Sequence, residues 1–170
     1  MHKQALEYVK WQTSYLRRPW PLAVEFGARD VNGTPRSVVE ADEYIGIDIA
    51  DGPGVDIVVD AADWDSPYAA DLVLCCETLE HTPRAWEIVH NAGRTLRAGG
   101  TFVMTCATDP RAPHSAHDGG PLRLGEHYKN VTLDEMREWC DSGNLDVVHA
   151  AVQNWPNHGG DLYVTAIRRR

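Results

Sequence analysis

Two apolar segments, joined through a glycine-containing loop and followed by an acidic residue, constrain this chain more than any other feature. Residues 22–26 predict a short strand, Gly27 begins a loop, and a second strand over 44–49 carries Asp48, 21 residues after Gly27. In nucleotide-binding βαβ units such a loop lies under the ligand, and a carboxylate about 20 residues further on accepts from the ribose hydroxyls. The spacing therefore predicts a parallel sheet with a nucleotide-type ligand at the carboxyl ends of its strands.

Hydrophobic periodicity and turn residues place the other elements. The early strands have tight or helical connections, which favour parallel pairing, whereas the last two are joined by the turn-rich residues 154–160 and should form an antiparallel hairpin. This order predicts an α/β fold with a doubly wound, mostly parallel sheet of about seven strands. The expected helices are 2–18, 33–41, 82–96 and 132–140, and the expected strands are 22–26, 44–49, 55–59, 71–76, 101–107, 145–152 and 161–167.

Local signals mark where some helices begin. Thr82 and Pro83 supply an N-cap and an N1 proline, and Thr132 with Glu135 forms a capping-box pattern. The helix over 33–41 has the weakest support, because a proline stands early in it and two β-branched valines stand late.

The net charge separates classes of partner. The chain has 16 lysine and arginine residues against 25 aspartate and glutamate residues, a formal charge of −9 at pH 7. Such a chain repels a polyphosphate unless a local basic patch outweighs its charge. The basic patches, Arg17-Arg18 and Arg168 to Arg170, lie near the two ends of the chain. Nucleic acid is therefore a disfavoured partner.

Size and cysteine usage indicate one intracellular domain over residues 1–170. A chain of this length with 43% hydrophobic residues can bury a full core without disulfide or metal staples. No stretch approaches the ~18 apolar residues of a membrane span, and residues 1–10 contain no apolar leader core. The cysteines show no CxxC spacing and mostly lie in apolar runs, so we expect buried, reduced thiols and a cytoplasmic location. They are Cys75, Cys76, Cys106 and Cys140.

Five segments, in this order, resemble motifs of the class I S-adenosylmethionine-dependent methyltransferases. Glu25-Phe26-Gly27 resembles the start of motif I, and Gly46-Ile47-Asp48 resembles the ribose-binding strand. Residues 59–63 resemble the adenine loop, residues 77–81 the "E-x-L-E-H" ending of the fourth strand, and residues 96–100 the "L-K/R-P-G-G" turn. Each match alone is weak, but five in the right order are jointly specific. The resemblance implies a Rossmann-like fold with a reversed last strand.

The resemblance also implies the cofactor, S-adenosylmethionine, and the residues that hold it. Gly27 and its neighbours would hold the methionine part, and Asp48 would accept from both ribose hydroxyls. Either Asp60 or Asp63 would take the adenine amino group. The implied cofactor residues are Glu25, Phe26, Gly27, Ala28, Arg29, Asp48, Ile49, Asp60, Ala61, Ala62, Asp63, Cys76 and Glu77.

Motif I departs from the family pattern. The family usually has acid-x-Gly-x-Gly-x-Gly, whereas Arg29 and Val31 occupy the second and third glycine positions here. Glycine is what permits positive φ and close backbone approach to a ligand. Asn32-Gly33 could supply the missing flexibility, Arg29 could form a salt bridge to the ligand carboxylate, or the cofactor could bind more weakly; these three alternatives stay open.

The stretch 108–130 is rich in proline, glycine and histidine and is too long for an ordinary connection. It follows the fifth strand, where the family often places acceptor recognition, so we expect a substrate loop. Its histidines could act as a base near neutral pH, or His114, His117 and Asp118 could bind a metal. A flexible polar lid with incidental histidines is the third interpretation, and no metal is assigned.

No catalytic residue is assigned, because methyl transfer from a sulfonium is an in-line displacement in which orientation can supply much of the catalysis. A base is needed only if the acceptor must lose a proton. Glu80-His81 is at least as well explained as a structural cap before a helix. The candidates are Glu77, His81, His114, His117, His127 and Tyr128.

The resemblance implies methyl transfer to a small-molecule or protein acceptor. The fourth-strand motif at 75–78 lacks the Asn/Asp-Pro-Pro-aromatic signature of amino-methylating DNA enzymes, which with the acidic charge argues against DNA. A nicotinamide-dependent oxidoreductase is an alternative, although a full Gly-x-Gly-x-x-Gly is missing. A catalytically degenerate Rossmann-like binding module is the other alternative, which the missing motif I glycines favour. The sequence predicts no oligomeric state.

Overall fold

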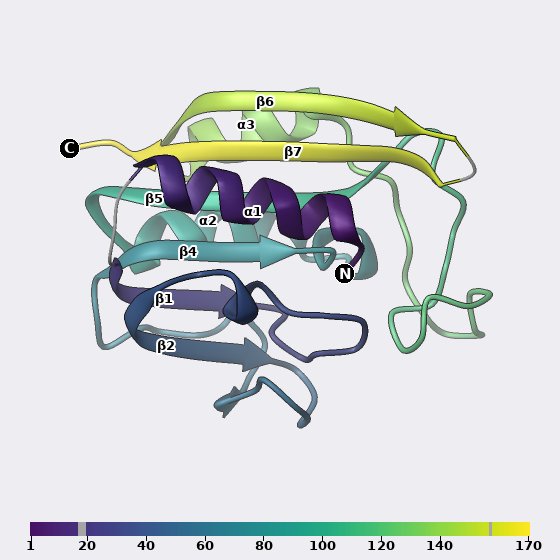
Figure 1. Ribbon diagram of the computed structural model, residues 1–170, viewed down its shortest axis with the longest axis horizontal. Helices are drawn as coiled ribbons and strands as arrows, with labels where there is room; N and C mark the ends of the chain where they lie inside the picture. Colours follow the sequence, from purple (N-terminus) through teal and green to yellow (C-terminus); the bar gives the residue numbers. More distant parts are fainter. Residues whose placement is uncertain (17–19, 157) are drawn as a thin grey trace.

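The computed structural model describes residues 1–16, 20–156 and 158–170. Within these residues, seven strands form one sheet with the order β3-β2-β1-β4-β5-β7-β6 (Figure 1). No helix in the described ranges has the length and apolar character needed to cross a membrane. The elements in chain order are α1 (Lys3–Leu16), β1 (Trp20–Phe26), η1 (Pro35–Ser37), β2 (Ala41–Asp48), β3 (Ile57–Val58), β4 (Ala70–Cys76), η2 (Leu79–His81), α2 (Ala85–Thr95), β5 (Leu96–Thr108), α3 (Leu133–Ser142), β6 (Leu145–Trp155) and β7 (Gly159–Arg168).

The strand directions confirm the predicted mixed sheet. Strands β3, β2, β1, β4 and β5 pair in parallel, and β7 pairs antiparallel with both β5 and β6. The carboxyl ends of the parallel strands therefore meet at one edge, and the beginning of the reversed strand β7 lies at that same edge. Parallel strands need crossover connections, which place helices over the faces of the sheet.

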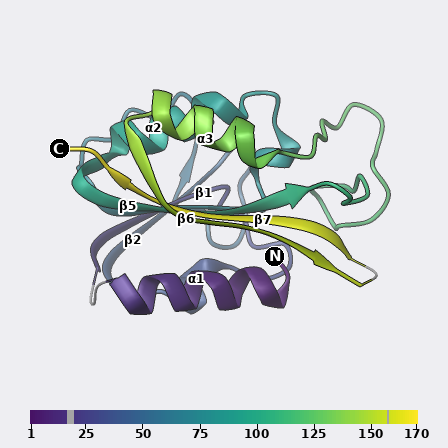
Figure 2. The same cartoon turned by 90° about the horizontal axis from the view of Figure 1, so that it is seen from above.

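Helices cover both faces of the sheet, with α2 and α3 on one side and α1 on the other (Figure 2). The larger apolar cluster includes Phe26 and Phe102 from the sheet and Met136 from α3. A smaller cluster places Val9 of α1 against Leu72 of β4. Because β4 is buried along its whole length, its continuous apolar sequence is the one expected of a central strand covered on both faces.

The predicted helix over 33–41 is wrong. Only the single turn η1 forms, after which the chain enters β2. The Thr34 hydroxyl accepts from the Arg36 N–H at 3.1 Å, so this turn is capped, but the two valines that follow favour extended backbone and no second turn forms. The predicted third strand, 55–59, is likewise reduced to the two residues of β3.

The predicted start of the helix at Thr82-Pro83 is also wrong. Helix α2 begins at Ala85, and the Thr82 hydroxyl accepts from the Arg84 N–H in the preceding turn. The helix ends at Thr95, and β5 already begins at the next residue. By contrast, the capping box of α3 is confirmed. The predicted first helix is α1. The last two residues predicted for it, 17 and 18, are also the predicted basic pair, and they lie outside the described residues.

Candidate active site

A cavity of about 1150 Å³ lies at the carboxyl edge of the sheet. Its walls come from the ends of β1, β2 and β4, from the first residues of the chain, and from residues 111–127. The long connection after β5 projects beyond this edge in both views of the fold (Figures 1 and 2). Segments far apart in the sequence therefore share one cavity.

Gly27 ends β1 in a conformation that requires glycine. Its φ is +77°, and a Cβ atom built on it would lie 2.0 Å from the Thr78 Oγ1. The N–H groups of Gly27 and Ala28 both donate to the Ile47 carbonyl, at 2.8 and 2.9 Å. The loop is thus held against β2 on one side and against the residues after β4 on the other, with no room for a side chain.

Asp48 is held by the backbone on both sides of it. The Arg29 N–H donates to its Oδ2 at 3.1 Å, and the Ala50 N–H donates to its Oδ1 at 3.0 Å. Each carboxylate oxygen has a second lone pair, so the group retains acceptor capacity toward the cavity that it lines. The orientation of this carboxylate is fixed before any ligand binds.

Arg29, which replaces a family glycine, connects two loops. Its aliphatic stem packs closely on Gly52, where a Cβ atom would lie 2.8 Å from the Arg29 Cγ. Its guanidinium Nη2 lies 3.4 Å from the His117 Nδ1. The side chain therefore runs from the loop after β1 toward the 108–130 loop, along the wall of the cavity.

Arg84 separates the roles of the two acids that follow β3. It donates to the Asp60 Oδ2 at 2.8 Å and to both oxygens of Asp63 at 2.7 Å. Asp60 lines the cavity together with Ala61. Asp63 does not line it, and its side chain is 61% exposed. Arg84 draws Asp63 to the surface, so Asp60 is the acid available to a ligand.

Glu25 is a buried acid at the end of β1. Its Oε2 accepts from the Tyr44 hydroxyl at 2.6 Å and from the Thr34 hydroxyl at 3.3 Å. Burial raises the pKa of Glu25 to about 7, although these two hydrogen bonds oppose the shift. Near neutral pH this carboxyl group therefore exists in both protonation states.

Glu77 follows β4 in a strained conformation. Its φ of +52° lies in the left-handed region, which residues with a Cβ atom seldom adopt. Its N–H donates to the Thr105 carbonyl at 2.8 Å, and its Oε1 accepts from the Thr105 hydroxyl at 2.9 Å. Both bonds orient the carboxylate toward the cavity, beside Cys76. The Cys76 thiol is buried, and that burial raises its pKa, so little of it is present as the nucleophilic thiolate.

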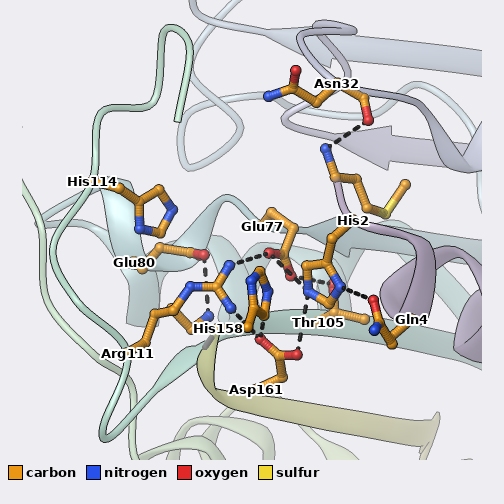
Figure 3. A network of polar contacts seen from close by, with 12 residues as sticks. His2, Gln4, Asn32, Glu77, Glu80, Thr105, Arg111, His114, His158 and Asp161 are labelled. Carbon is orange, nitrogen blue, oxygen red and sulfur yellow. Dashed lines mark hydrogen bonds and ion pairs between the residues drawn. The ribbon is translucent and has the colours of Figure 1, made fainter. Parts of the chain in front are cut away.

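A charged network that the sequence did not predict surrounds Glu77 (Figure 3). Arg111 lies 2.7 Å from the Asp161 Oδ1 and 3.8 Å from the Glu77 Oε2. The His2 Nε2 lies 3.3 Å from Asp161 and 3.5 Å from Glu77. Burial alone would lower the pKa of His2, but the bond to Asp161 and the charge of Glu77 outweigh it, and the pKa is raised. The sequence does contain one signal for this network. Asp161 stands near the start of the strand predicted to be reversed, and the start of that strand lies at the ligand edge.

His81 and His114 lie together at the cavity wall, with Tyr128 behind them. The ring centroids of the two histidines are 5.0 Å apart, and Tyr128 lies 4.9 Å from His114. Burial lowers the pKa of His81 to about 4, so its imidazole is neutral. The adjacent Glu80 is fully buried, and burial raises its pKa to about 8.

The three residues considered for a metal in the sequence, His114, His117 and Asp118, are not brought together. Asp118 pairs with Arg123, and the His117 Nε2 lies 3.5 Å from Glu126. The ligand-type grouping in this region instead joins His114 to two residues that follow β4.

The other predicted site residues divide into those that line the cavity and those that do not. Phe26 and Ala28 are buried beneath the loop, and Ala62 and Asp63 lie outside the cavity. Of the catalytic candidates, Tyr128 alone does not line it. The predicted residues that line the cavity are Glu25, Gly27, Arg29, Asp48, Ile49, Asp60, Ala61, Cys76, Glu77, His81, His114, His117 and His127.

Comparison with known sequences gives distant relatives. No protein-family model matches the chain. It is 28% identical over 102 residues to the ubiquinone biosynthesis O-methyltransferase of Leptothrix cholodnii, and 31% identical over 101 residues to that of Paracidovorax citrulli. Each match covers 55% of this chain and 43% or 42% of the relative. The matched region thus spans less than half the length of either relative.

Comparison with solved structures covers nearly the whole chain. The 1,6-didemethyltoxoflavin-N1-methyltransferase of Burkholderia thailandensis, solved with 1,6-didemethyltoxoflavin and S-adenosylhomocysteine, gives a TM-score of 0.72 at 16% identity over 98% of this chain and 79% of that one. The N-methyltransferase NodS of Bradyrhizobium japonicum, in complex with S-adenosylhomocysteine, gives a TM-score of 0.71 at 12% identity, over 99% of this chain and 87% of that one. The chain therefore has the fold of the class I S-adenosylmethionine-dependent methyltransferases and is a distant sequence relative of the ubiquinone biosynthesis O-methyltransferases.

Proposed function

We propose that the protein transfers a methyl group from S-adenosylmethionine to a small-molecule acceptor. The observation that carries this proposal is the preoriented Asp48 carboxylate, which the Arg29 and Ala50 N–H groups hold in the same cavity as the Gly27 loop and Asp60. The ribose of this cofactor presents a vicinal diol and the adenine an amino group, both of which donate hydrogen bonds to carboxylates, and the methionine part can lie along the Gly27 backbone loop. The homologous structures that hold S-adenosylhomocysteine or S-adenosylmethionine add support.

The residues along the cavity wall suit successive parts of the cofactor. The Gly27 loop would meet the methionine part, Asp48 would accept from the ribose hydroxyls, and Asp60 with the Ala61 backbone would meet the adenine. Cys76 and Glu77, at the end of β4, would then lie beside the sulfonium. Glu77 brings a carboxylate, whose negative charge suits a positively charged sulfur and methyl group.

The chemistry needs little more than orientation. The acceptor atom would attack the methyl carbon in line with the breaking carbon–sulfur bond, whose electron pair would stay on sulfur, and an acceptor O–H or N–H would lose its proton to solvent or to a side chain of the cavity. The acceptor would enter from the 108–130 loop, where His114, His117 and His127 line the cavity. A cavity of about 1150 Å³ can hold the cofactor and a small second molecule. We further propose one domain in a reducing cytoplasm, which the four buried free cysteines support.

A calorimetric titration with S-adenosylhomocysteine tests the proposal. The parent protein should bind the nucleoside with one site per chain. Asp48→Asn should bind it at least tenfold more weakly, because a neutral amide replaces the acceptor for two hydroxyls, each worth about 1 kcal/mol or more. Asp51→Asn is the matched control: the Asp51 carboxylate accepts from the Gly52 N–H and does not line this cavity, so the variant should bind like the parent.

Two results would contradict the proposal. Equal affinity of Asp48→Asn and the parent for S-adenosylhomocysteine would show that Asp48 does not bind the ribose. Absence of binding at millimolar ligand, combined with a folded protein by circular dichroism, would favour the degenerate binding module. A fluorescence titration with NADH tests the alternative of a nicotinamide-dependent oxidoreductase. Saturable binding of NADH, without binding of S-adenosylhomocysteine, would favour that alternative.

A further inference from the structure

Three ligand-type side chains meet at the wall of the cavity, outside the set assigned to the cofactor. One ligand atom each of Glu80, His81 and His114 lies within 4.8 Å of the other two. Glu80 and His81 belong to η2, directly after β4, and His114 comes from the 108–130 loop. Figure 3 shows the Glu80 carboxyl group lying against the His114 ring. The fold thus brings one carboxyl group and two imidazoles to a single point.

Two polar atoms of this cluster are buried without a hydrogen-bond partner among the described residues. Glu80 is 0% exposed; its Oε1 accepts from the Ala107 N–H at 3.1 Å, but its Oε2 has no partner. The His81 Nδ1 has none either. A buried acceptor left unpaired costs free energy, so native proteins usually satisfy such atoms with another group, with water or with an ion. These atoms point to a ligand that the protein chain does not supply.

We propose that Glu80, His81 and His114 bind a divalent first-row transition metal of the Zn²⁺ or Mn²⁺ type. One carboxylate and two imidazoles form the donor set that such ions accept, whereas Mg²⁺ and Ca²⁺ prefer oxygen ligands throughout. His81 and His114 line the cavity, so the remaining coordination positions face the space where an acceptor would bind. This site goes beyond the proposed methyl transfer, and metal binding does not depend on it.

The neighbouring charges are compatible with a cation here. Arg111 is a positive charge that acts on both Glu80 and His81, but its guanidinium is already paired with Asp161 at 2.7 Å and lies 3.8 Å from Glu77. A second grouping, His2, His158 and Asp161, also brings ligand-type atoms together. It is the weaker site, because Arg111 and the Tyr163 hydroxyl already occupy the two Asp161 oxygens.

Titration of the untagged protein with Zn²⁺, in the absence of cofactor, tests the site. Calorimetry should show one strong Zn²⁺ site per chain, and Co²⁺ should give the visible absorption of a coordinated ion. Glu80→Gln and His114→Ala should each weaken Zn²⁺ binding by at least about tenfold, since even residues behind a metal ligand contribute that much. Glu80→Gln keeps the acceptor for the Ala107 N–H, and His114→Ala lies in a surface loop, so at least one variant should fold like the parent.

Matched controls locate the ion. His117→Ala removes another imidazole from the same loop, 53% exposed, and should bind Zn²⁺ like the parent. His158→Ala removes the second grouping and should also bind like the parent. No saturable Zn²⁺ site, or binding lost in His158→Ala but kept in His114→Ala, would overturn the proposal. Binding of S-adenosylhomocysteine, measured separately, keeps this outcome distinct from failure of the proposed methyl transfer.

Discussion

At the scale of single residues, Glu25 carries a free-energy cost that depends on pH. Its carboxyl group is 3% exposed, and burial raises its pKa from 4.5 to about 7. Between these two values the unfolded chain has lost the proton while the folded chain retains it. The unfolded state is therefore favoured increasingly as the pH rises, up to a limit of about 3 kcal/mol. The contribution of Glu25 to stability is complete below pH 4.5 and is lost as the pH passes about 7.

Glu25→Gln should remove this pH dependence. Glutamine keeps an oxygen that can accept from Tyr44 and Thr34 but cannot ionise. Relative to the parent, the variant should gain about 2 to 3 kcal/mol of unfolding free energy between pH 5 and pH 8, measured by guanidinium unfolding. Glu43→Gln, on an exposed position of β2, is the control and should follow the parent. If the difference in unfolding free energy between parent and variant did not change with pH, the assigned ionisation of Glu25 would be contradicted.

Single residues also show where sequence reasoning reached its limit at the site. Asp48 could be singled out because it ends β2, the strand that pairs with β1. The spacing between Gly27 and Asp48 along the chain is enough to predict this position. Asp60 and Asp63 could not be separated, because the choice depends on Arg84, 21 residues beyond Asp63 and on another element. A contact between distant segments leaves no local pattern in either of them.

At the scale of elements, α3 depends on its capping box. The Thr132 hydroxyl accepts from the Glu135 N–H at 3.2 Å, and the Glu135 carboxylate accepts from the Thr132 N–H at 2.9 Å. Thr132→Ala should therefore destabilise the protein by about 1 kcal/mol in guanidinium unfolding. Ser142→Ala, at the exposed far end of the same helix, is the control and should cost about 0.5 kcal/mol or less. Equal losses in both variants would show that the cap contributes nothing specific.

Elements with strong local signals were predictable, and those that depend on packing were not. The capping box marked α3 because both partners lie within four residues of each other. Thr82-Pro83 has an equally good local pattern, yet these residues lie in a turn between η2 and α2. Leu79 and Glu80 of η2 are buried, and in the turn that follows the Thr82 hydroxyl accepts from the Arg84 N–H, so Thr82 does not cap α2. The segment 33–41 forms only one turn for a local reason, because the two valines after η1 favour extended backbone.

At the scale of the whole molecule, the parallel order of the sheet made the ligand edge predictable. The sequence also predicts the reversed last strand, but not the contacts that this strand makes at the site. Because β7 begins where β5 ends, Asp161 reaches Arg111, which is 50 residues away in sequence. The Glu77 network joins residues that lie just before α1, just after β4 and just after β5 with Asp161 of β7 (Figure 3). Such an arrangement exists only after the sheet has closed.

The burial of all four cysteines makes their chemistry a measure of how the whole molecule opens. Cys75 and Cys106 are fully buried in β4 and β5, and burial raises the pKa of every one of the four thiols, that of Cys140 to about 12. Only a thiolate attacks a disulfide reagent. Native protein should therefore show no fast reaction with Ellman's reagent at pH 8, whereas all four thiols should react in guanidinium.

The slow native reaction should occur at the rate of global unfolding, measured independently by circular dichroism, for the thiols in the central strands. Cys76 is the informative exception, because it is 7% exposed and lines the cavity. It should react first, and S-adenosylhomocysteine should slow that reaction if the nucleoside covers it. Cys76→Ser is the control, in which the early phase disappears. An early phase that persists in Cys76→Ser would mean that β4, β5 or α3 opens locally, and that the sheet and its covering helices do not unfold as one unit.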